Sequence, residues 1–400
     1  MLRIEGKHNQ AIVYTDELDD NAAGQIKALC DQSFTQGARI RMMPDVHAGA
    51  GCVIGTTMTV GDKIVPNLVG VDIGCGMETV RISQRRADFP KLDSLIRRAI
   101  PAGMTVRDTP HSYAEQIDLS QLRCGAKLGL ERGYRSIGTL GGGNHFIEVD
   151  QDEEANLYLV IHSGSRHLGL EVAHFYQQAA WDQRNGRSRY QQEELIAQLR
   201  REGREKEIQQ RLKELKQDRA EIPFALAYVE DELFDDYLHD MALMQRFAAI
   251  NRQAMAREIL RGMHWDEEER FTTVHNYIDT EAMILRKGAV AAVSGQRLLI
   301  PINMRDGSLI CRGKGNAEWN CSAPHGAGRL MSRKEAKESF TLSEFKKQMA
   351  GVFSTTVAKD TLDECPMAYK SMDYIVAQIG PTAEIEKVIR PLYNFKAGEE

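Results

Sequence analysis

The sequence has few cysteines and lacks any long hydrophobic run. Seven cysteines are scattered over 400 residues, and this sparse, odd-numbered set argues against a disulfide framework. No apolar stretch approaches the roughly 20 residues that a membrane-spanning helix needs, and residues 1–6 show no apolar core of a signal peptide. We therefore expect a protein of the reducing cytoplasm that has no membrane partner.

An excess of positive charge is also missing. The formal net charge of −6 gives no general nucleic-acid signature, although a local basic groove would be enough to bind RNA or DNA. The composition, 42% hydrophobic and 27% charged, is that of an ordinary globular protein. Because neither an internal repeat nor a low-complexity linker interrupts the chain, we expect a single domain over residues 1–400.

A glycine-rich stretch at residues 70–77 places an acid and a thiol, Asp72 and Cys75, three positions apart. Glycines permit tight turns and close approach of the backbone, and the apolar run 64–69 predicts a strand that leads into this turn. A cysteine beside a carboxylate is a candidate metal-ligating thiolate. A buried structural cysteine fits such a bend equally well, so both interpretations stay open on these residues alone.

Two histidines end strand-like apolar runs. Residues 157–161 lead into His162, and residues 271–274 lead into His275. A single histidine in such a place is more often structural than functional. Its repetition in the same context favours a site built where strands end.

Two glycine-rich turns carry further candidates. The run 39–47 predicts a strand that brings Asp45 and His47 to one turn. The stretch 138–149 contains His145 after a run of glycines that resembles a phosphate loop. It lacks the Lys-Ser/Thr pair of such a loop and opens a strand instead of a helix, so glycine content alone is weak evidence.

Helical periodicity is strongest between residues 168 and 265. Within it, residues 193–221 are mostly charged with an apolar stripe, and Gly203 is expected to interrupt the helix. We interpret 168–265 as a helical insertion within the domain. Shorter helices are predicted at 21–30 and 92–100, and together with the strands they indicate an α+β fold.

Late in the chain, His325 is flanked by small residues and followed by Arg329 and Arg333. Small neighbours let a ligand approach the imidazole, and arginine offers bidentate hydrogen bonds to phosphate oxygens. This stretch is therefore a candidate phosphate site.

Taken together, five ordered motifs resemble the RtcB family and span nearly the whole chain. They are Pro44-Asp45-Val46-His47, Asp72-Ile73-Gly74-Cys75-Gly76, Gly143-Asn144-His145-Phe146, His162-Ser163-Gly164-Ser165-Arg166 and His325-Gly326-Ala327-Gly328-Arg329. The family comprises GTP- and manganese-dependent RNA ligases, which join an RNA 3′-phosphate or 2′,3′-cyclic phosphate end to a 5′-hydroxyl end. The resemblance implies an RtcB-type single compact domain, with mixed and antiparallel sheets flanked by helices. It also allows an activating protein factor as a partner.

The resemblance implies two manganese ions that share the Cys75 thiolate. Asp72, Cys75 and His145 match the ligands of one ion, whereas Cys75, His162 and His275 match those of the other. Ligand chemistry alone would favour zinc, which such a cysteine and histidine set binds more tightly than manganese. Manganese is thus implied by the resemblance only.

The remaining functional residues are carried over in the same way. His325 matches the nucleophile that becomes guanylylated. The positions matching nucleotide contacts are Asn144, Phe146, Glu148, Asn303, Ser308, Ala327, Gly328, Tyr369 and Lys396, and those expected at RNA or its phosphates are Asp45, Arg166, Arg329 and Arg333.

Several positions depart from the family pattern and point to a divergent member of bacterial type. The family usually reads Pro-Gly-Ser-Met-Gly where this chain has residues 301–305, so Asn303 replaces a serine expected near guanosine. Pro324 and Cys52 are also unusual. A metal-dependent hydrolase of RNA ends, such as a cyclic phosphodiesterase, is the first alternative. An RNA-binding protein with a structural zinc is the second, and tRNA, rRNA repair and splicing substrates all stay open.

Overall fold

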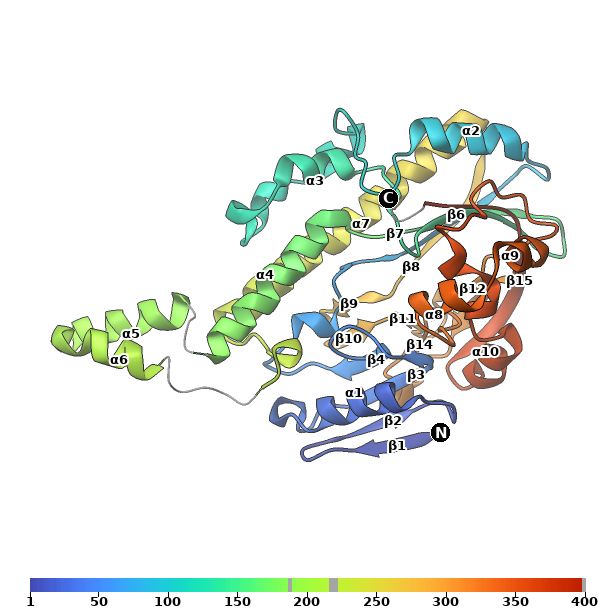
Figure 1. The fold of residues 1–400 in the computed structure, drawn as a ribbon. Helices are drawn as coiled ribbons and strands as arrows, with labels where there is room; N and C mark the ends of the chain where they lie inside the picture. Colours follow the sequence, from blue (N-terminus) through green and yellow to red (C-terminus); the bar gives the residue numbers. More distant parts are fainter. Residues whose placement is uncertain (186–188, 216–221, 398–400) are drawn as a thin grey trace.

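The structure is a computed structural model that describes residues 1–185, 189–215 and 222–397. Ten α-helices and three β-sheets form within these residues (Figure 1). The helices are α1 (Asp20–Cys30), α2 (Phe89–Ala99), α3 (Leu130–Ser136), α4 (Arg166–Arg184), α5 (Arg189–Arg201), α6 (Ile208–Leu215), α7 (Glu232–Met263), α8 (Arg333–Ser339), α9 (Leu342–Gln348) and α10 (Met372–Ile379). The strands are β1 (Leu2–Glu5), β2 (Gln10–Val13), β3 (Ile40–His47), β4 (Ile54–Thr59), β5 (Gly76–Ile82), β6 (Phe146–Gln151), β7 (Leu157–Ser163), β8 (Glu267–Val274), β9 (Asn276–Asp279), β10 (Ile284–Lys287), β11 (Ala289–Ala291), β12 (Arg297–Asn303), β13 (Gly307–Gly313), β14 (Ser322–Pro324) and β15 (Ala383–Lys396). The predicted α+β class is confirmed.

A seven-stranded antiparallel sheet runs in the order β12-β13-β15-β6-β7-β5-β8. In its centre, Phe146 of β6 pairs with His162 of β7, which also pairs with Met77 of β5. Gly76 of β5 pairs in turn with Val274 of β8. Four neighbouring strands therefore begin or end at the same edge of the sheet, and the loops at that edge are held close together.

A six-stranded sheet, in the order β1-β2-β3-β4-β10-β9, lies next to this edge. Its strands are antiparallel except for the parallel pair β2 and β3. The chain passes from one sheet to the other at His275, which lies between the last residue of β8 and the first of β9. The His275 N–H donates a hydrogen bond of 3.0 Å to the Cys75 carbonyl. The junction of the two sheets is thus fixed at two of the predicted metal ligands.

The long helix α7 packs against β5 and β7 and against α2 and α4 (Figure 1). Five of its apolar residues are buried and recur every three or four positions along one face: Leu233, Tyr237, Met241, Met244 and Phe247. Residues near its C-terminal end join a second hydrophobic cluster, with α2 and the strands of the larger sheet. None of the described helices combines the length and the apolar character that crossing a lipid bilayer requires.

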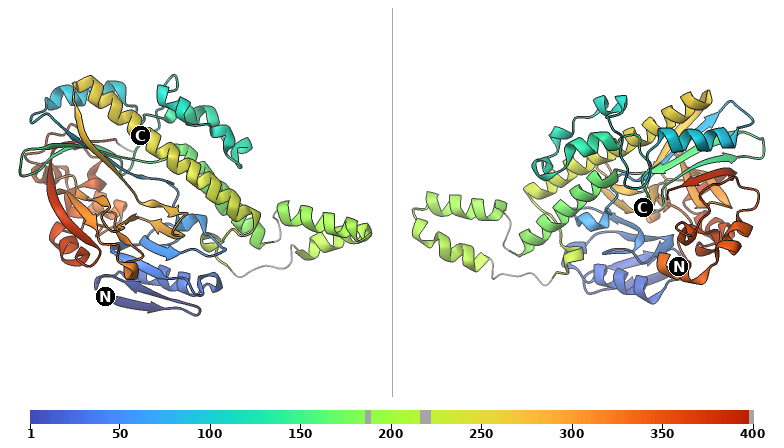
Figure 2. Two further views of the ribbon diagram at one scale, coloured as in Figure 1. Left: turned by 180° about the vertical axis from the view of Figure 1, so that it is seen from behind. Right: turned by 45° about the horizontal axis from the view of Figure 1, so that its top comes forward.

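Helices α5 and α6 pack on each other and project from the rest of the protein in every view (Figures 1 and 2). Gly203 separates them with a left-handed φ of 70°, which confirms the predicted interruption. Residues 216–221, at the end of the charged segment, lie outside the described residues. The insertion assigned to 168–265 stays a prediction, because α4 and α7 at its two ends are part of the packed body.

One predicted strand is wrong. Residues 64–69 were expected to form a strand, but Pro66–Leu68 form a short 3-10 helix and only Ile64 makes an isolated bridge, to Val229. Pro66 has no N–H to donate to a strand neighbour, and its fixed φ suits the first position of a helical turn. The short helices predicted at 21–30 and 92–100 are confirmed as α1 and α2.

We predict that Phe247→Ala lowers the free energy of unfolding by about 3–5 kcal/mol, because Phe247 is fully buried in the cluster around α7. The matched control is Phe224→Ala, because Phe224 is 46% exposed and its truncation should cost less than about 1 kcal/mol. Chemical unfolding followed by circular dichroism measures both. Equal losses in the two variants would contradict the role assigned to α7.

Candidate active site

Five predicted metal ligands meet at the sheet junction. Cys75 directly precedes β5, His145 directly precedes β6, and His162 lies near the end of β7. His275 joins β8 to β9, and Asp72 is in the glycine-rich loop before β5. The register of the four central strands therefore brings together residues that are up to 203 positions apart in the sequence, from Asp72 to His275.

The ligand atoms form two triads that share the Cys75 sulfur. One triad is Asp72, Cys75 and His145, and the other is Cys75, His162 and His275. The Cys75 Sγ atom lies 3.5 Å from His145 Nε2 and 3.3 Å from His162 Nε2. The Asp72 Oδ2 atom lies 3.0 Å from His145 Nε2, and the Nε2 atoms of His162 and His275 are 3.4 Å apart.

The hydrogen bonds of the imidazole rings show that this donor set fits metal ions. His145 Nδ1 lies 3.0 Å from the Leu140 carbonyl and His162 Nδ1 lies 3.1 Å from the Asn144 carbonyl. Because a carbonyl only accepts, each Nδ1 atom carries a proton, which in a neutral ring leaves the lone pair on Nε2; His145 Nε2 also lies 3.0 Å from Asp72 Oδ2, a second acceptor, so a cation fits between these two atoms. Burial lowers the pKa of His162 and of His275 well below the ordinary value, so both rings are neutral. Lone pairs that converge on one sulfur need a cation between them.

The pKa of the Cys75 thiol also indicates that this site requires a cation. Burial, followed by the charge of Asp72, raises the pKa of Cys75 well above its ordinary value. A cation held by the two triads would stabilise the thiolate, which is the form that ligates metals. The two triads therefore suit a pair of bound divalent ions better than they suit a Cys75 thiol with no metal beside it.

His325 lies beside this cluster, at the end of β14. Its ring centroid is 5.0 Å from that of His275, and its Nδ1 donates a hydrogen bond of 2.6 Å to Asp45 Oδ2. The same carboxylate oxygen accepts the backbone N–H groups of His325 and Gly326, at 3.0 and 3.3 Å. In the neutral ring this hydrogen bond leaves the lone pair on Nε2, the nitrogen that can act as a nucleophile.

Asp45, which was expected at RNA phosphates, has no exposed surface and is not among the residues that line the cavity described next. It comes from β3, in the smaller sheet, and lies beneath His325. An anionic carboxylate in this position orients the imidazole and would repel a phosphate. The contact with His325 favours a positioning role for Asp45, and its expected phosphate contact stays a prediction.

A cavity opens on the other side of His162, His275 and His325. Most of the residues expected at nucleotide or RNA phosphate line it. They are Asn144, Phe146, Glu148, Asn303, Ala327, Gly328, Arg329, Arg333, Tyr369 and Lys396. His162 and His275 of one triad and the imidazole of His325 thus form part of the wall of this cavity.

A buried carboxylate that the sequence did not reveal, Glu364, organises the cations of this cavity. It pairs with Lys396, lies 3.0 Å from Arg333 Nη1 and 3.3 Å from Arg329 Nη1, and accepts a hydrogen bond of 2.7 Å from Tyr369. Burial alone would raise its pKa, but the charges of Lys396 and Arg333 outweigh burial and lower the pKa of Glu364 to about 2. No motif or spacing marked this residue in advance.

Comparison with known proteins agrees with this geometry. The family model described as tRNA-splicing ligase RtcB matches residues 25–134 and 115–397. The chain belongs to the RtcB family. It is 33% identical to the RNA-splicing ligase RtcB1 of an Escherichia coli strain, over 89% of this chain and 90% of that protein. It is 32% identical to the RNA-splicing ligase RtcB of E. coli K12 over the same shares, and 26% identical to the tRNA-splicing ligase RtcB of Aeropyrum pernix, over 95% and 92%.

The departure from the usual RtcB pattern at Asn303 has a local structural role. The Asn303 Oδ1 atom accepts the backbone N–H groups of Arg305 and Asp306, at 3.0 and 2.9 Å, and Nδ2 donates to Asp306 Oδ2 at 2.8 Å. The side chain thus closes the turn between β12 and β13. Although Asn303 lines the cavity, its polar atoms are already used in that turn.

Three other residues lie outside the cavity lining. Ser308, expected at the nucleotide, is fully buried on β13. Pro324 pairs with Ala289 in the short sheet of β11 and β14, and Cys52 is buried in the main hydrophobic core. The two departures, Pro324 and Cys52, leave the ligand set and His325 in place.

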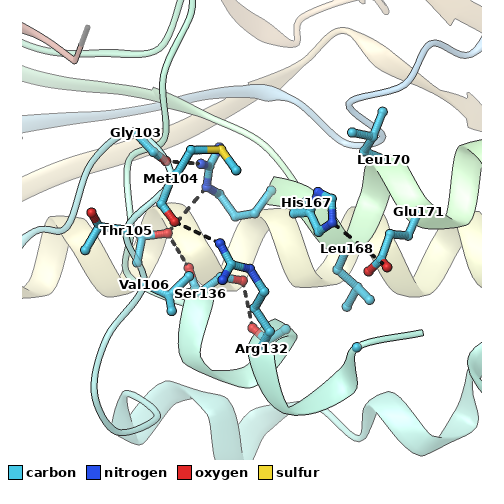
Figure 3. Close-up of a pocket in the computed structure, with 14 residues that line it drawn as sticks. Gly103, Met104, Thr105, Val106, Arg132, Ser136, His167, Leu168, Leu170 and Glu171 are labelled. Atoms are coloured by element: carbon cyan, nitrogen blue, oxygen red, sulfur yellow. Dashed lines mark hydrogen bonds and ion pairs between the residues drawn. The ribbon is translucent and has the colours of Figure 1, made fainter. Parts of the chain in front are cut away.

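Arg166 does not line this cavity. Its Nη1 is 3.3 Å from His145 Nδ1, and its side chain lines a second pocket with Arg132, Met104 and His167 (Figure 3). Arg132 donates a hydrogen bond of 2.8 Å to the Met104 carbonyl in this pocket. The predicted RNA contacts are therefore divided: Arg329 and Arg333 face the cavity, whereas Arg166 faces the second pocket.

We predict that Gly164→Ala weakens metal binding at least about tenfold with little loss of stability. A Cβ atom at Gly164 would lie 2.1 Å from Asp72 Oδ1, so the flexible carboxylate must leave its place. Isothermal titration with Mn²⁺ and metal analysis measure the effect. Gly24→Ala, where no atom lies within 4 Å of the added Cβ, is the control that should bind like wild type. Equal affinity in both variants would remove Asp72 from the ligand set.

Proposed function

We propose that the chain is an RNA ligase that consumes GTP, with RNA as its substrate. It joins an RNA 3′-phosphate or 2′,3′-cyclic phosphate end to a 5′-hydroxyl end, through a guanylylated His325. The observation that carries the proposal is the imidazole of His325, which Asp45 holds at 2.6 Å with Nε2 free, beside two metal-ligand triads and a cationic cavity. Membership of a family whose matched members are named RNA- or tRNA-splicing ligases supports it.

The triads Asp72, Cys75 and His145, and Cys75, His162 and His275, would hold two divalent ions, which we propose to be Mn²⁺. When bound, the ions supply Lewis-acid neutralisation of phosphate charge. The protein supplies their ligands in fixed tautomers, because the backbone carbonyls of Leu140 and Asn144 hold the opposite nitrogen of two rings.

In the first step, His325 Nε2 attacks the α-phosphorus of GTP. The N–P bond forms, the bond from that phosphorus to the β-phosphate oxygen breaks, and pyrophosphate leaves with the electron pair. Positive charge develops on the imidazole ring. The Nδ1–H group keeps its hydrogen bond to Asp45, and the Asp45 carboxylate stabilises this charge. Lys396, Arg329 and Arg333 line the same cavity and would position the nucleotide phosphates.

In the later steps, an oxygen of the RNA 3′-phosphate attacks the phosphorus on His325, and the N–P bond breaks to free the imidazole. The 5′-hydroxyl of the second RNA end then attacks the activated 3′-phosphorus, GMP leaves, and the hydroxyl proton passes to water. A 2′,3′-cyclic phosphate must first be opened by water. Arg166 and Arg333 lie on two sides of the cluster, where each would hold RNA phosphate.

We predict that incubation with Mn²⁺ and GTP labelled at the α-phosphate labels wild type but not His325→Ala. The bond should be labile in acid and stable in alkali, as expected of a phosphoramidate. His174→Ala, which removes an exposed histidine of α4, is the matched control and should be labelled normally. Gel electrophoresis with phosphorimaging measures the label.

A well-folded, manganese-loaded wild type without label would contradict the guanylylation step. Cyclic phosphate opening without GTP would then favour the hydrolase of RNA ends. Recovery of the label on adding a cell extract would instead indicate a dependence on an activating factor.

We also predict that Asp45→Asn slows guanylylation by at least about 100-fold while metal binding stays unchanged. The amide removes the negative charge that stabilises the imidazolium and weakens the selection of the Nδ1–H tautomer. Single-turnover label formation, with metal content measured in parallel, tests this. Asp62→Asn, an exposed acid, serves as the control. A rate equal to wild type would show that Asp45 does not assist His325.

A further inference from the structure

One histidine of the cavity, His47, has no role in the steps above. It is the last residue of β3 and lines the cavity together with His325. Its strand partner on β4 is Ile54. Ile54 and His325 lie against the same glycine, because a Cβ atom at Gly288 would be 2.1 Å from Ile54 Cγ2 and 3.2 Å from His325 Cε1. The pairing of β3 with β4 thus brings His47 close to the proposed nucleophile.

Asp45 holds both imidazole rings by their Nδ1 atoms. Its carboxylate accepts a hydrogen bond of 2.6 Å from His325, and its backbone carbonyl lies 2.8 Å from His47 Nδ1. Because a carbonyl only accepts, His47 Nδ1 carries a proton, and in the neutral ring the lone pair is on Nε2. In the part of the chain that the structure describes, His47 Nε2 makes no hydrogen bond, yet it is not among the buried polar atoms without a partner. This nitrogen therefore keeps accessible surface and is open to a substrate in the cavity.

The two rings differ in the charge that Asp45 offers them. The carboxylate beside His325 stabilises a positive ring, as guanylylation requires, whereas the neutral carbonyl beside His47 does so much less. Burial lowers the pKa of His47 below its ordinary value. The hydrogen bond and the charge of Asp45 act against burial, whereas the charges of His325 and Arg329 act with it. The paired residue on β4, Ile54, is apolar, so His47 is an unprotonated base at neutral pH.

Only two of the proposed steps require a proton to be removed. His325 Nε2 attacks GTP with a lone pair, and the RNA 3′-phosphate attacks as an anion, so neither of these steps needs a base. Attack by the 5′-hydroxyl on the activated 3′-phosphorus does, and so does attack by water on a 2′,3′-cyclic phosphate, because a hydroxyl is a weak nucleophile until a base takes its proton. A proton acceptor in the cavity would thus accelerate these two steps and leave guanylylation unaffected.

The other proton acceptors that line the cavity are already engaged. Glu364 is paired with Lys396 and two arginines, and these cations make it a weak base. Glu148 is 3% exposed and accepts a hydrogen bond of 2.6 Å from Asn394. Two further histidines of the lining belong to a metal-ligand triad. Apart from the nucleophile itself, His47 is therefore the base left for a substrate hydroxyl among the described residues of the lining.

We propose that His47 is the general base that takes the proton from the hydroxyl attacking an RNA-end phosphate, an assignment that rests on the proposed function. In the joining step, the bond from O5′ to the activated phosphorus forms and the bond from that phosphorus to the GMP oxygen breaks. GMP leaves with the electron pair, and the hydroxyl proton moves to His47 Nε2 and then to water. When a cyclic phosphate opens, the water oxygen bonds to phosphorus, His47 takes its proton, and the P–O2′ bond breaks. The imidazolium then returns that proton to O2′.

The test uses an RNA whose 3′-phosphate already carries GMP, so that guanylylation is bypassed. In His47→Asn, an amide N–H can replace Nδ1–H at the Asp45 carbonyl, but no lone pair remains at the position of Nε2. Joining of this RNA to a 5′-hydroxyl end should slow at least about 100-fold, whereas labelling of His325 by GTP should stay near the wild-type level. The matched control is His174→Asn, which changes an exposed histidine of α4 and should join like wild type.

The pH dependence separates a base from a residue that only supports the fold. Wild-type joining of the activated RNA should fall about tenfold per pH unit below the pKa of His47 and level off above it, because only the neutral ring accepts a proton. His47→Asn should lose this break. Added imidazole should restore part of the joining rate in His47→Ala and should not change the wild-type rate.

Joining by His47→Asn at the wild-type rate would overturn the proposal. So would a pH break that His47→Asn retains and His325→Ala loses, because the freed His325 would then be the base. If His47→Asn does not fold, His47→Gln and the wild-type profile decide, and a wild-type joining rate that stays constant across acidic pH would overturn the proposal.

The proposed function and this role of His47 can fail separately. If GTP does not label wild type and activated RNA is not joined, the ligase function fails. Opening of a 2′,3′-cyclic phosphate, compared between wild type and His47→Asn, then still decides whether His47 is a base. Equal opening rates in the two proteins would overturn the assignment.

Discussion

The convergence of histidine lone pairs on the Cys75 sulfur is the constraint on which the rest of the structure depends. Two backbone carbonyls fix the protons of His145 and His162 on Nδ1, so that both Nε2 atoms face the thiol within 3.5 Å. Without a cation, the Cys75 thiol and the two imidazoles gain little interaction energy from lying so close together. The fold must therefore hold them together by means that do not depend on their mutual attraction.

Helix α7 provides much of that support. Its Arg252 is fully buried and donates from Nη1 to the carbonyls of Gly74 and Ser163, each at 2.9 Å. One side chain thereby ties the loop before Cys75 to the residue after His162. Gly74 has a φ of 72°, and a Cβ atom there would lie 2.8 Å from the Gln245 backbone of the same helix. The glycine-rich turn is needed because helix and loop approach so closely.

The sequence predicted the components of the site better than their arrangement. Strand-ending histidines and the Asp72–Cys75 turn can be recognised locally, since short apolar runs and glycines mark them. The register that aligns β6, β7, β5 and β8 is a tertiary property, and no local pattern contains it. Asp45 shows the same limit, because its contact with His325 joins β3 to β14 across 280 positions of the chain.

Buried acids were the least predictable part. Glu364 sits in a short 3-10 helix with no motif around it, and only the folded chain shows that three cations converge on it. The strand predicted at residues 64–69 failed for a local reason. The prediction gave more weight to the apolar run than to Pro66, which cannot donate a hydrogen bond to a neighbouring strand. Local hydrophobic pattern thus locates elements reliably, whereas the partners of buried charges depend on packing.

Glu364 also limits how the cavity can attract phosphates. Lys396, Arg329 and Arg333 contribute three positive charges around Glu364, and Arg333 also pairs with the buried Asp363 at 2.8 Å, so that nearby acids offset part of this positive charge. The carboxylate holds the three side chains in fixed positions before a phosphate arrives, so less conformational entropy is lost on binding. Its negative charge weakens the attraction for any single phosphate. The cluster therefore favours an anion with several charges spread over neighbouring groups, such as a nucleoside triphosphate or the phosphates of an RNA end, over an isolated monovalent ion.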